Sequence, residues 1–237
     1  MCYPQDSARQ RIEEVDVEIL QCERYCTDTD NFKNKRLYGT IVQPHKSFEV
    51  NVSGTAVAGL EIYEEYCDSY YGYSVFKVQT PLTSPGRAID DYHKSLALGM
   101  LGSDYDKAIK IMNELHNSYT YSQGVTQIHE TAENALSLRM GVCQDFAHIM
   151  IALLRKEGIP ARYVVGIMLG EGAAHAWVEA LCNGYWYGFD PTNNKLVNDE
   201  YLRFSVGRDS TDCPVIRGSF YGTARQKQSE SVVVERL

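Results

Sequence analysis

The chain has 237 residues, of which 44% are hydrophobic and 23% charged, and its formal net charge is −8. This length is enough to bury a sizeable core in one large domain or two small ones. The negative charge argues against nucleic acid or an anionic membrane as a partner. No apolar run approaches the length of a membrane span, and the first residues lack the pattern of a signal peptide, so we expect a cytoplasmic protein.

The seven cysteines form no CxxC pair and show no zinc-type spacing. A chain in a reducing compartment keeps such cysteines as free thiols. We therefore expect no disulfide framework, no metal site and no other cofactor.

Residues 11–80 alternate apolar and polar side chains in several short runs, with turn-rich segments such as 27–34 between them. This pattern is typical of an antiparallel β-sandwich or β-meander. The sequence 81–87, PLTSPGR, then reads as a linker. We expect an N-terminal β-region over 1–84, serving as a packing partner or groove wall, and a second domain over 85–237.

Three helices are predicted after the linker, over 88–101, 104–119 and 131–139. Ser103 or Asp104 can cap the second helix, and Thr131 can cap the third.

A fourth helix is predicted from about Cys143 to Glu157. Its apolar residues occupy nearly every face, so we expect it to be buried all round. Gly158 is suited to a left-handed helix end. We interpret His148, within this helix, as a core histidine rather than a second base.

Cys143 begins this helix, where free backbone N–H groups create a positive field that favours a thiolate and can hold a developing oxyanion. Most lone cysteines are only small core residues. Asp145 in the first turn suits the helix dipole, and since its carboxylate opposes a thiolate we expect it to point away from the sulfur.

Three strands follow, over 161–169, 175–181 and 185–190, and Asn183-Gly184 between the last two is a strong hairpin signal. A two-residue loop sets Cys182 opposite Tyr185, Trp177 opposite Asp190, and His175 diagonal to Asp190. A loop two residues longer sets His175 opposite Asp190. Either register puts both side chains on one face of the sheet.

A helix-terminal cysteine followed by a paired histidine and carboxylate is the arrangement of nucleophile, base and orienting group. In this interpretation His175 takes the proton of Cys143, and Asp190 holds the imidazole and stabilises the imidazolium. Two neighbours are candidate substrate-binding residues: Gln144 after the nucleophile and Trp177 beside His175.

Further along, 199–204 is ambiguous between strand and short helix, while 215–223 and 229–236 read as two terminal strands. We expect these strands to pair with the same sheet or close it.

Several blocks of the chain resemble the transglutaminase-like superfamily of papain-type cysteine enzymes, in its bacterial form. These blocks are YSQGVT (121–126), GVCQDFAH (141–148), GIPARYVVG (158–166), HAWVEA (175–180) and FDPTN (189–193). The segments 28–50 and 201–222 also resemble the N-terminal β-region and the tail of these proteins. The resemblance implies an α+β fold, with a papain-like core in which a helix bearing Cys143 packs on an antiparallel sheet bearing His175 and Asp190. It also implies that Tyr121, in the first of these blocks, lines the site as a third candidate substrate-binding residue. The short GEGAA segment before His175 departs from the pattern and leaves little room for a substrate-binding loop.

These observations favour a cysteine-dependent acyl-transfer enzyme acting on amide bonds of peptides or protein glutamines through a Cys143, His175, Asp190 triad. Hydrolysis, as in a peptidase or amidase, is favoured over cross-linking, because the sequence lacks obvious calcium loops. The alternatives are a true protein-glutamine transglutaminase, a non-catalytic protein-binding module that keeps the fold, and a metalloprotein that uses the same three residues as ligands.

Overall fold

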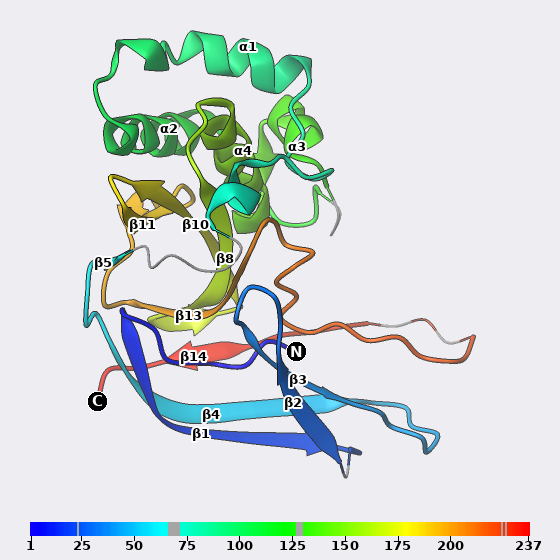
Figure 1. The fold of residues 1–237 in the computed structure, drawn as a ribbon. Coiled ribbons are helices and arrows are strands. Elements are labelled where there is room, and N and C mark those ends of the chain that lie inside the picture. The colour runs from blue at the N-terminus through cyan, green and yellow to red at the C-terminus, as the bar shows by residue number, and fades with distance from the viewer. Residues whose placement is uncertain (23, 66–71, 127–129, 224, 226) are drawn as a thin grey trace.

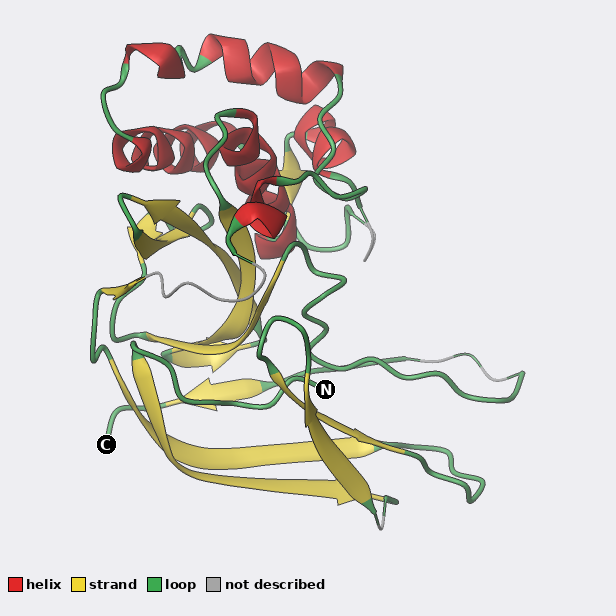
Figure 2. Ribbon diagram, in the orientation of Figure 1, coloured by secondary structure: helices red, strands yellow, loops and turns green. Residues whose placement is uncertain are grey.

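The computed structural model describes residues 1–22, 24–65, 72–126, 130–223, 225 and 227–237. Its centre is an antiparallel six-stranded sheet with the order β12-β11-β10-β8-β13, in which β5 also pairs with β11. Helices lie at one end of the molecule and the N-terminal strands at the other, with the sheet between them (Figures 1 and 2). The α+β class is confirmed. The strands of the sheet are β5 (Tyr63–Glu65), β8 (Ala161–Met168), β10 (His175–Cys182), β11 (Tyr185–Asp190), β12 (Lys195–Leu196) and β13 (Tyr201–Gly207).

The helices follow the predicted pattern with one difference. Ser103 and Thr131 accept hydrogen bonds from backbone N–H groups three residues on and cap α2 and α3 as expected. The helix predicted over 88–101 instead ends early, because Ala97 takes a left-handed conformation (φ 49°) before a short 3₁₀ turn. The helical elements are η1 (Ser74–Lys77), α1 (Arg87–Ser95), η2 (Leu98–Met100), α2 (Asp104–Ser118), α3 (Ala132–Leu138) and α4 (Cys143–Lys156).

Helix α4 is the centre of the hydrophobic core. Every residue from Phe146 to Leu154 is buried, as its all-apolar surface predicts. One face of α4 packs on β8 and β10, and the other helices cover the rest. Gly158 has φ +75° and ends the helix in the left-handed conformation expected of it. The helix is thus held rigidly, and the position of its first residue is set by this packing.

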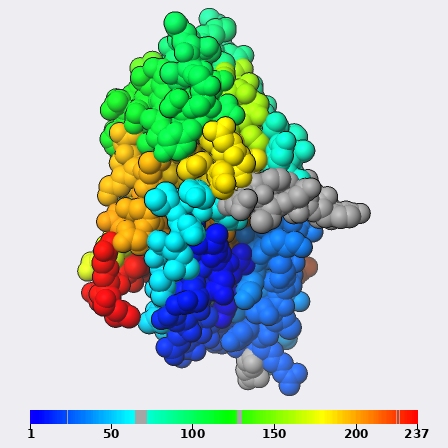
Figure 3. Space-filling model, turned by 60° about the vertical axis from the view of Figure 1, so that its left-hand side comes forward, coloured from blue at the N-terminus to red at the C-terminus, as the bar shows by residue number. Residues whose placement is uncertain are grey.

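The N-terminal region forms two separate two-stranded pairs. Strand β1 (Gln10–Leu20) pairs with β4 (Glu49–Ala58), and β2 (Tyr25–Thr29) pairs with β3 (Lys35–Gly39). They form the lower part of the molecule (Figure 3). The expected alternation is present, but most of these side chains are exposed, so two ribbons form in place of two packed sheets.

Four short strands lie outside these sheets. Strand β6 (Thr120–Tyr121) pairs in parallel with β7 (Met140–Gly141), and β9 (Gly170–Gly172) pairs with β14 (Val232–Val234). The second predicted terminal strand is therefore present, although it pairs with β9 and not with the central sheet. The prediction of a strand over 215–223 is wrong, because those residues form bends and irregular chain.

Side-chain amides from the N-terminal region complete the outer edge of β13. The Asn34 amide donates to the carbonyl oxygen of Val206 (2.7 Å) and accepts from its N–H (2.8 Å). Gln10 does the same for Arg203, at 2.7 Å for both bonds. Both amides are buried, so they replace a neighbouring strand and satisfy backbone groups that water cannot reach.

A buried ion cluster adds to this contact on the sheet face away from α4. The Glu179 carboxylate is 1% exposed and lies 2.6 Å from Arg162, 3.3 Å from Arg203 and 3.5 Å from Arg9. Burial raises the pKa of Glu179, but the guanidinium charges outweigh it and bring the pKa to about 2. The charge of Glu179 is thus matched by groups from both regions.

We predict that Asn34→Ala lowers the free energy of unfolding by roughly 2–3 kcal/mol, because it leaves the N–H and carbonyl of Val206 buried without partners. Chemical denaturation monitored by circular dichroism measures this. Asn51→Ala, which removes a single exposed contact to Glu18, is the matched control and should change stability by less than about 0.5 kcal/mol. Equal effects of the two substitutions would show that the amide does not support the edge of β13.

Candidate active site

Cys143 is the first residue of α4 and is half-buried. The preceding residue, Val142, has extended backbone angles (φ −109°, ψ 178°), so the chain enters the helix sharply at the cysteine. The first backbone N–H groups of a helix have no intrahelical partners. The thiol therefore stands in the positive field of the helix terminus, as the sequence predicts.

Asp145 fastens the entry to this helix. Its Oδ2 accepts hydrogen bonds from the N–H of Val142 (2.8 Å) and the hydroxyl of Thr126 (2.7 Å), and the residue is 1% exposed. Burial raises the pKa of Asp145 against the effect of these two bonds. The carboxylate is thus turned back toward the residues before the cysteine.

Gly141 leaves the space that this carboxylate needs. A Cβ at position 141 would come within 2.3 Å of Asp145 Oδ2 and 2.6 Å of the Tyr119 hydroxyl. The loop preceding the cysteine also pairs with β6, where Ser122 N–H donates to the Gly141 carbonyl (2.8 Å). Glycine is required there because the backbone passes directly over a buried carboxylate.

The β10–β11 hairpin brings His175 to Asp190. Cys182 pairs with Tyr185, and Asn183 and Gly184 have φ of 52° and 86°, so the loop has two residues and the first of the two predicted registers is confirmed. His175 is therefore diagonal to Asp190 on the same face of the sheet. Its Nε2 lies 2.8 Å from Asp190 Oδ2.

The His175 ring is held in its charged form. Burial lowers the pKa of His175, but hydrogen bonding to Asp190 and to Cys143, together with their charges, outweighs it and raises the pKa to about 10. Because Nε2 bonds to Asp190, Nδ1 is the nitrogen left for the Cys143 side. The Cys143 sulfur is thus the second group that acts on the ring, beside the Asp190 carboxylate.

Asp190 is a fully buried carboxylate with a complete set of donors. Its Oδ2 accepts from His175, from the Asn193 amide (2.7 Å) and from the Tyr201 hydroxyl (2.8 Å), while Oδ1 accepts from the N–H groups of Thr192 (2.9 Å) and Asn193 (3.2 Å). Burial raises the pKa of Asp190, but these hydrogen bonds and the charge of His175 outweigh it and lower the pKa. Asp190 is therefore fixed in position and stays ionised.

The sequence-based interpretation missed Tyr201 as a partner of Asp190. The sequence could have indicated Asn193 as a partner, since it lies three residues after Asp190 in the FDPTN block. Tyr201 begins β13, at the outer edge of the sheet beyond β8, and no local pattern marks that placement.

The three predicted substrate-binding residues differ in their surroundings. Trp177 is 1% exposed, stacks on His175 with ring centres 6.3 Å apart, and meets Tyr201 edge-on at 5.3 Å. It therefore shields one side of the His175–Asp190 pair and offers little surface to a substrate. Tyr121 is 49% exposed in β6, where it pairs with Gly141, and Gln144 is half-buried in the first turn of α4, so both keep accessible surface.

His148 belongs to the core, as expected. It is fully buried, and its Nε2 accepts a hydrogen bond from the N–H of Ser210 (3.2 Å). Burial lowers the pKa of His148 to about 4, so the ring is neutral near pH 7.

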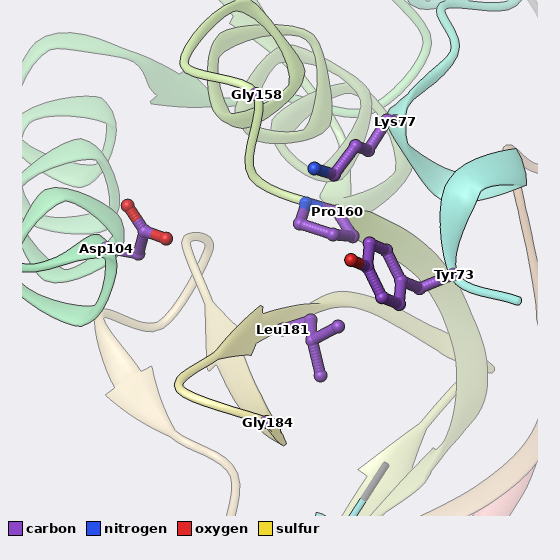
Figure 4. A pocket seen from close by; sticks show the side chains of 7 residues that line it. All are labelled: Tyr73, Lys77, Asp104, Gly158, Pro160, Leu181 and Gly184. Atoms are coloured by element: carbon purple, nitrogen blue, oxygen red, sulfur yellow. The ribbon is translucent and has the colours of Figure 1, made fainter. Parts of the chain in front are cut away.

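A shallow hollow of about 290 Å³ lies at the other end of α4. Gly158, Pro160 and Leu181 form part of it, and Lys77 and Asp104 reach toward it from opposite sides (Figure 4). Since α4 has 14 residues, this hollow is roughly 20 Å from Cys143 along the helix axis. It is therefore separate from the candidate site at Cys143, His175 and Asp190.

Within the described ranges, the structure contains no group of three or more His, Cys, Asp or Glu residues arranged to hold a metal ion. No helix among those residues is long and apolar enough to cross a membrane.

Comparison with known proteins relates the central part of the chain to one superfamily. Residues 94–191 match the transglutaminase-like superfamily. An uncharacterized protein of Mycobacterium leprae is 38% identical over 127 residues, which cover 49% of this chain and 45% of that protein. An uncharacterized protein of Mycobacterium tuberculosis is 36% identical over 127 residues, covering 47% and 40% respectively. The chain thus spans less than half the length of these curated relatives.

The fold as a whole is also found in a solved structure. A protein of Cytophaga hutchinsonii, described as a candidate cysteine protease, superimposes with a TM-score of 0.65 over 97% of this chain and 88% of its own, at 22% identity. That likeness shows a shared fold. Together with the match over residues 94–191, it shows that this chain contains a transglutaminase-like superfamily core.

Proposed function

We propose that the protein is a cysteine-dependent acyl-transfer enzyme that acts on amide bonds of peptides or protein glutamines and hydrolyses them. The main support for this proposal is the environment of the His175 imidazole ring. His175 is held by Asp190 at 2.8 Å, and the Cys143 thiol at the start of α4 helps to raise its pKa to about 10. A non-catalytic binding module has no need for a buried carboxylate, an imidazolium and a helix-terminal thiol in one place.

In the resting enzyme the thiol proton of Cys143 has passed to His175, which gives a thiolate–imidazolium pair. In the first half of the reaction, this thiolate attacks the carbonyl carbon of the amide. The backbone N–H of Cys143 is placed to stabilise the oxyanion that forms. The C–N bond breaks as the His175 imidazolium gives its proton to the leaving nitrogen, and a thioester remains on Cys143.

In the second half, water loses a proton to the now neutral His175 and attacks the thioester. The C–S bond breaks, a carboxylic acid leaves, and the thiolate–imidazolium pair is restored. Throughout, Asp190 holds the ring orientation and stabilises its charge without exchanging a proton. An amine that replaces water in this step gives transamidation, the alternative activity for the same residues.

The proposal is tested by intact-protein mass spectrometry after incubation with peptide and glutamine-donor libraries. We expect a mass increase that maps to Cys143, followed by release of free acid in water. With an added primary amine, the product ratio of acid to substituted amide separates hydrolysis from transfer. The absence of any adduct across the libraries, with the thiol intact, would contradict the proposal.

Cys143→Ala and His175→Ala should each lower kcat/KM by at least about 10³-fold, because they remove the nucleophile and the proton-transfer group. Cys143→Ala should leave the unfolding midpoint nearly unchanged, since it removes little volume. Cys26→Ala is the control, because the Cys26 thiol is exposed on β2 and its loss should leave kcat/KM unchanged. Unfolding of Cys143→Ala would assign Cys143 a structural role. Loss of activity in Cys26→Ala would show that the effect is not specific to Cys143.

Substitutions of Asp190 should fall in a defined order, with Asp190→Asn more active than Asp190→Ala and both above the His175→Ala variant. Asparagine keeps one acceptor oxygen for the ring, whereas alanine keeps none. Because the raised pKa keeps His175 protonated, the wild-type kcat/KM should fall only as the pH approaches about 10. That alkaline limb should move to lower pH in both variants, since the raising effect of the carboxylate is lost. Unchanged pH profiles would show that Asp190 is only the turn residue before Pro191.

Tyr201→Phe removes one of three donors to Asp190 Oδ2 and leaves the ring packing on Trp177 intact. We predict a three- to tenfold loss of kcat/KM, in keeping with one hydrogen bond of about 1 kcal/mol. Tyr185→Phe, on the opposite face of the β10–β11 hairpin, is the control. A loss as large as that of His175→Ala would instead place the hydroxyl in the chemistry.

A further inference from the structure

The segment immediately before His175 carries a strand from the far end of the chain. Strand β14 pairs antiparallel with β9, with Val232 opposite Gly172, Val233 opposite Glu171 and Val234 opposite Gly170. Strand β9 ends at Gly172, three residues before His175. The edge beside the candidate base is thus occupied by an extended stretch of the chain itself.

Two side-chain contacts fasten this stretch on either side of the paired residues. Glu230 Oε1 accepts a hydrogen bond from the N–H of Ala174 (2.7 Å), the residue next to His175. Arg236 forms an ion pair with Asp199 (2.9 Å), in which both side chains are more than half exposed and contribute little. The segment 230–236 is therefore held mainly by backbone pairing, with one carboxylate placed next to the catalytic region.

The edge of β9 is suited to a partner of variable sequence. A Cβ built at Gly170 or Gly172 would meet nothing within 4 Å, so the residues opposite these glycines have room for large side chains. Val232 and Val234 take these positions and are half-buried, whereas Val233 points outward and is 62% exposed. Backbone pairing with alternate side chains in open positions is the way sheet edges bind extended peptides.

We propose that β9 is the edge on which an extended peptide substrate docks as an added antiparallel strand, and that Val232–Val234 occupy this edge in competition with it. This inference rests on the function proposed above. The preferred peptide has β-branched or other bulky residues at two alternate positions, and an acidic residue two positions before the first of them, as Glu230 precedes Val232.

The direction of the strand defines which part of the substrate is read. In the antiparallel register, the chain preceding Val232 runs toward Ala174 and His175. A peptide docked in the same way brings the residues that precede its paired segment to the site. The paired residues then belong to the leaving side of the scissile bond.

Competition by a tethered strand has a measurable consequence. The segment 230–236 acts at a high local concentration because it belongs to the same chain. Only the fraction of molecules with an open edge binds the peptide, so the apparent KM is raised by the inverse of that fraction while kcat is unaffected.

The test uses the full chain with Val232→Asp and Val234→Asp combined, and Val233→Asp as the matched control at the exposed position. Hydrogen exchange of the amides of 170–174 should become at least tenfold faster in the double variant and stay unchanged in the control. Glu230→Ala is a milder second variant, with Glu235→Ala as its control, and should speed the exchange of the Ala174 amide. Unchanged exchange in both Glu230→Ala and the double variant would overturn the proposal.

Binding is measured apart from catalysis in a Cys143→Ala background. A fluorescent peptide with the sequence of residues 228–237 should bind the double variant and bind the parent protein more weakly, and a scrambled peptide should bind neither. Failure of this peptide to bind the opened protein would overturn the docking edge whether or not the protein hydrolyses amides.

Steady-state kinetics then test whether the substrate itself docks on the β9 edge. For a peptide hydrolysed by the wild type, the double variant should show an apparent KM lowered by about three- to tenfold at constant kcat. An opened edge with an unchanged KM would show that the substrate docks elsewhere. Absence of hydrolysis together with clear binding of the 228–237 peptide would contradict the proposed function and leave the docking edge standing.

Discussion

The contact between His175 and Asp190 depends on the register of one hairpin. With the two-residue Asn183-Gly184 loop, the two side chains fall diagonally on one sheet face and meet at 2.8 Å. A shift of one residue would send one of them to the opposite face. Asp190 has no access to water, so its charge requires the donors that surround it, and these also hold its orientation.

The cysteine is placed by a different constraint, the packing of α4. This helix is buried on all sides, so its first residue is held at a fixed point relative to the sheet. Asp145 ties the preceding loop to the helix start, and Gly141 leaves room for it. The N-terminal region supports the outer edge of β13 through buried amides and the sheet face away from α4 through a buried charge. The site therefore depends on elements from most of the chain.

Much of this arrangement follows from local patterns in the sequence. The all-apolar helix, its glycine end, the Ser103 and Thr131 caps and the hairpin loop each depend on neighbouring residues, and each prediction is confirmed. The contacts that local patterns leave open are those between distant segments. Tyr201 reaches Asp190 from the edge strand, the β14 strand pairs with β9, and the N-terminal strands form exposed ribbons, all as results of tertiary placement.

The proposed reaction rests on one state of His175, an imidazolium held between Asp190 and Cys143. It is tested most directly by NMR titration of the His175 ring nitrogens in the unmodified protein, with Asp190→Asn and Cys143→Ala alongside. We expect the ring to stay protonated far above pH 6.5 and to titrate near pH 10, and at lower pH in each variant. Titration near pH 6.5 in all three proteins would contradict it.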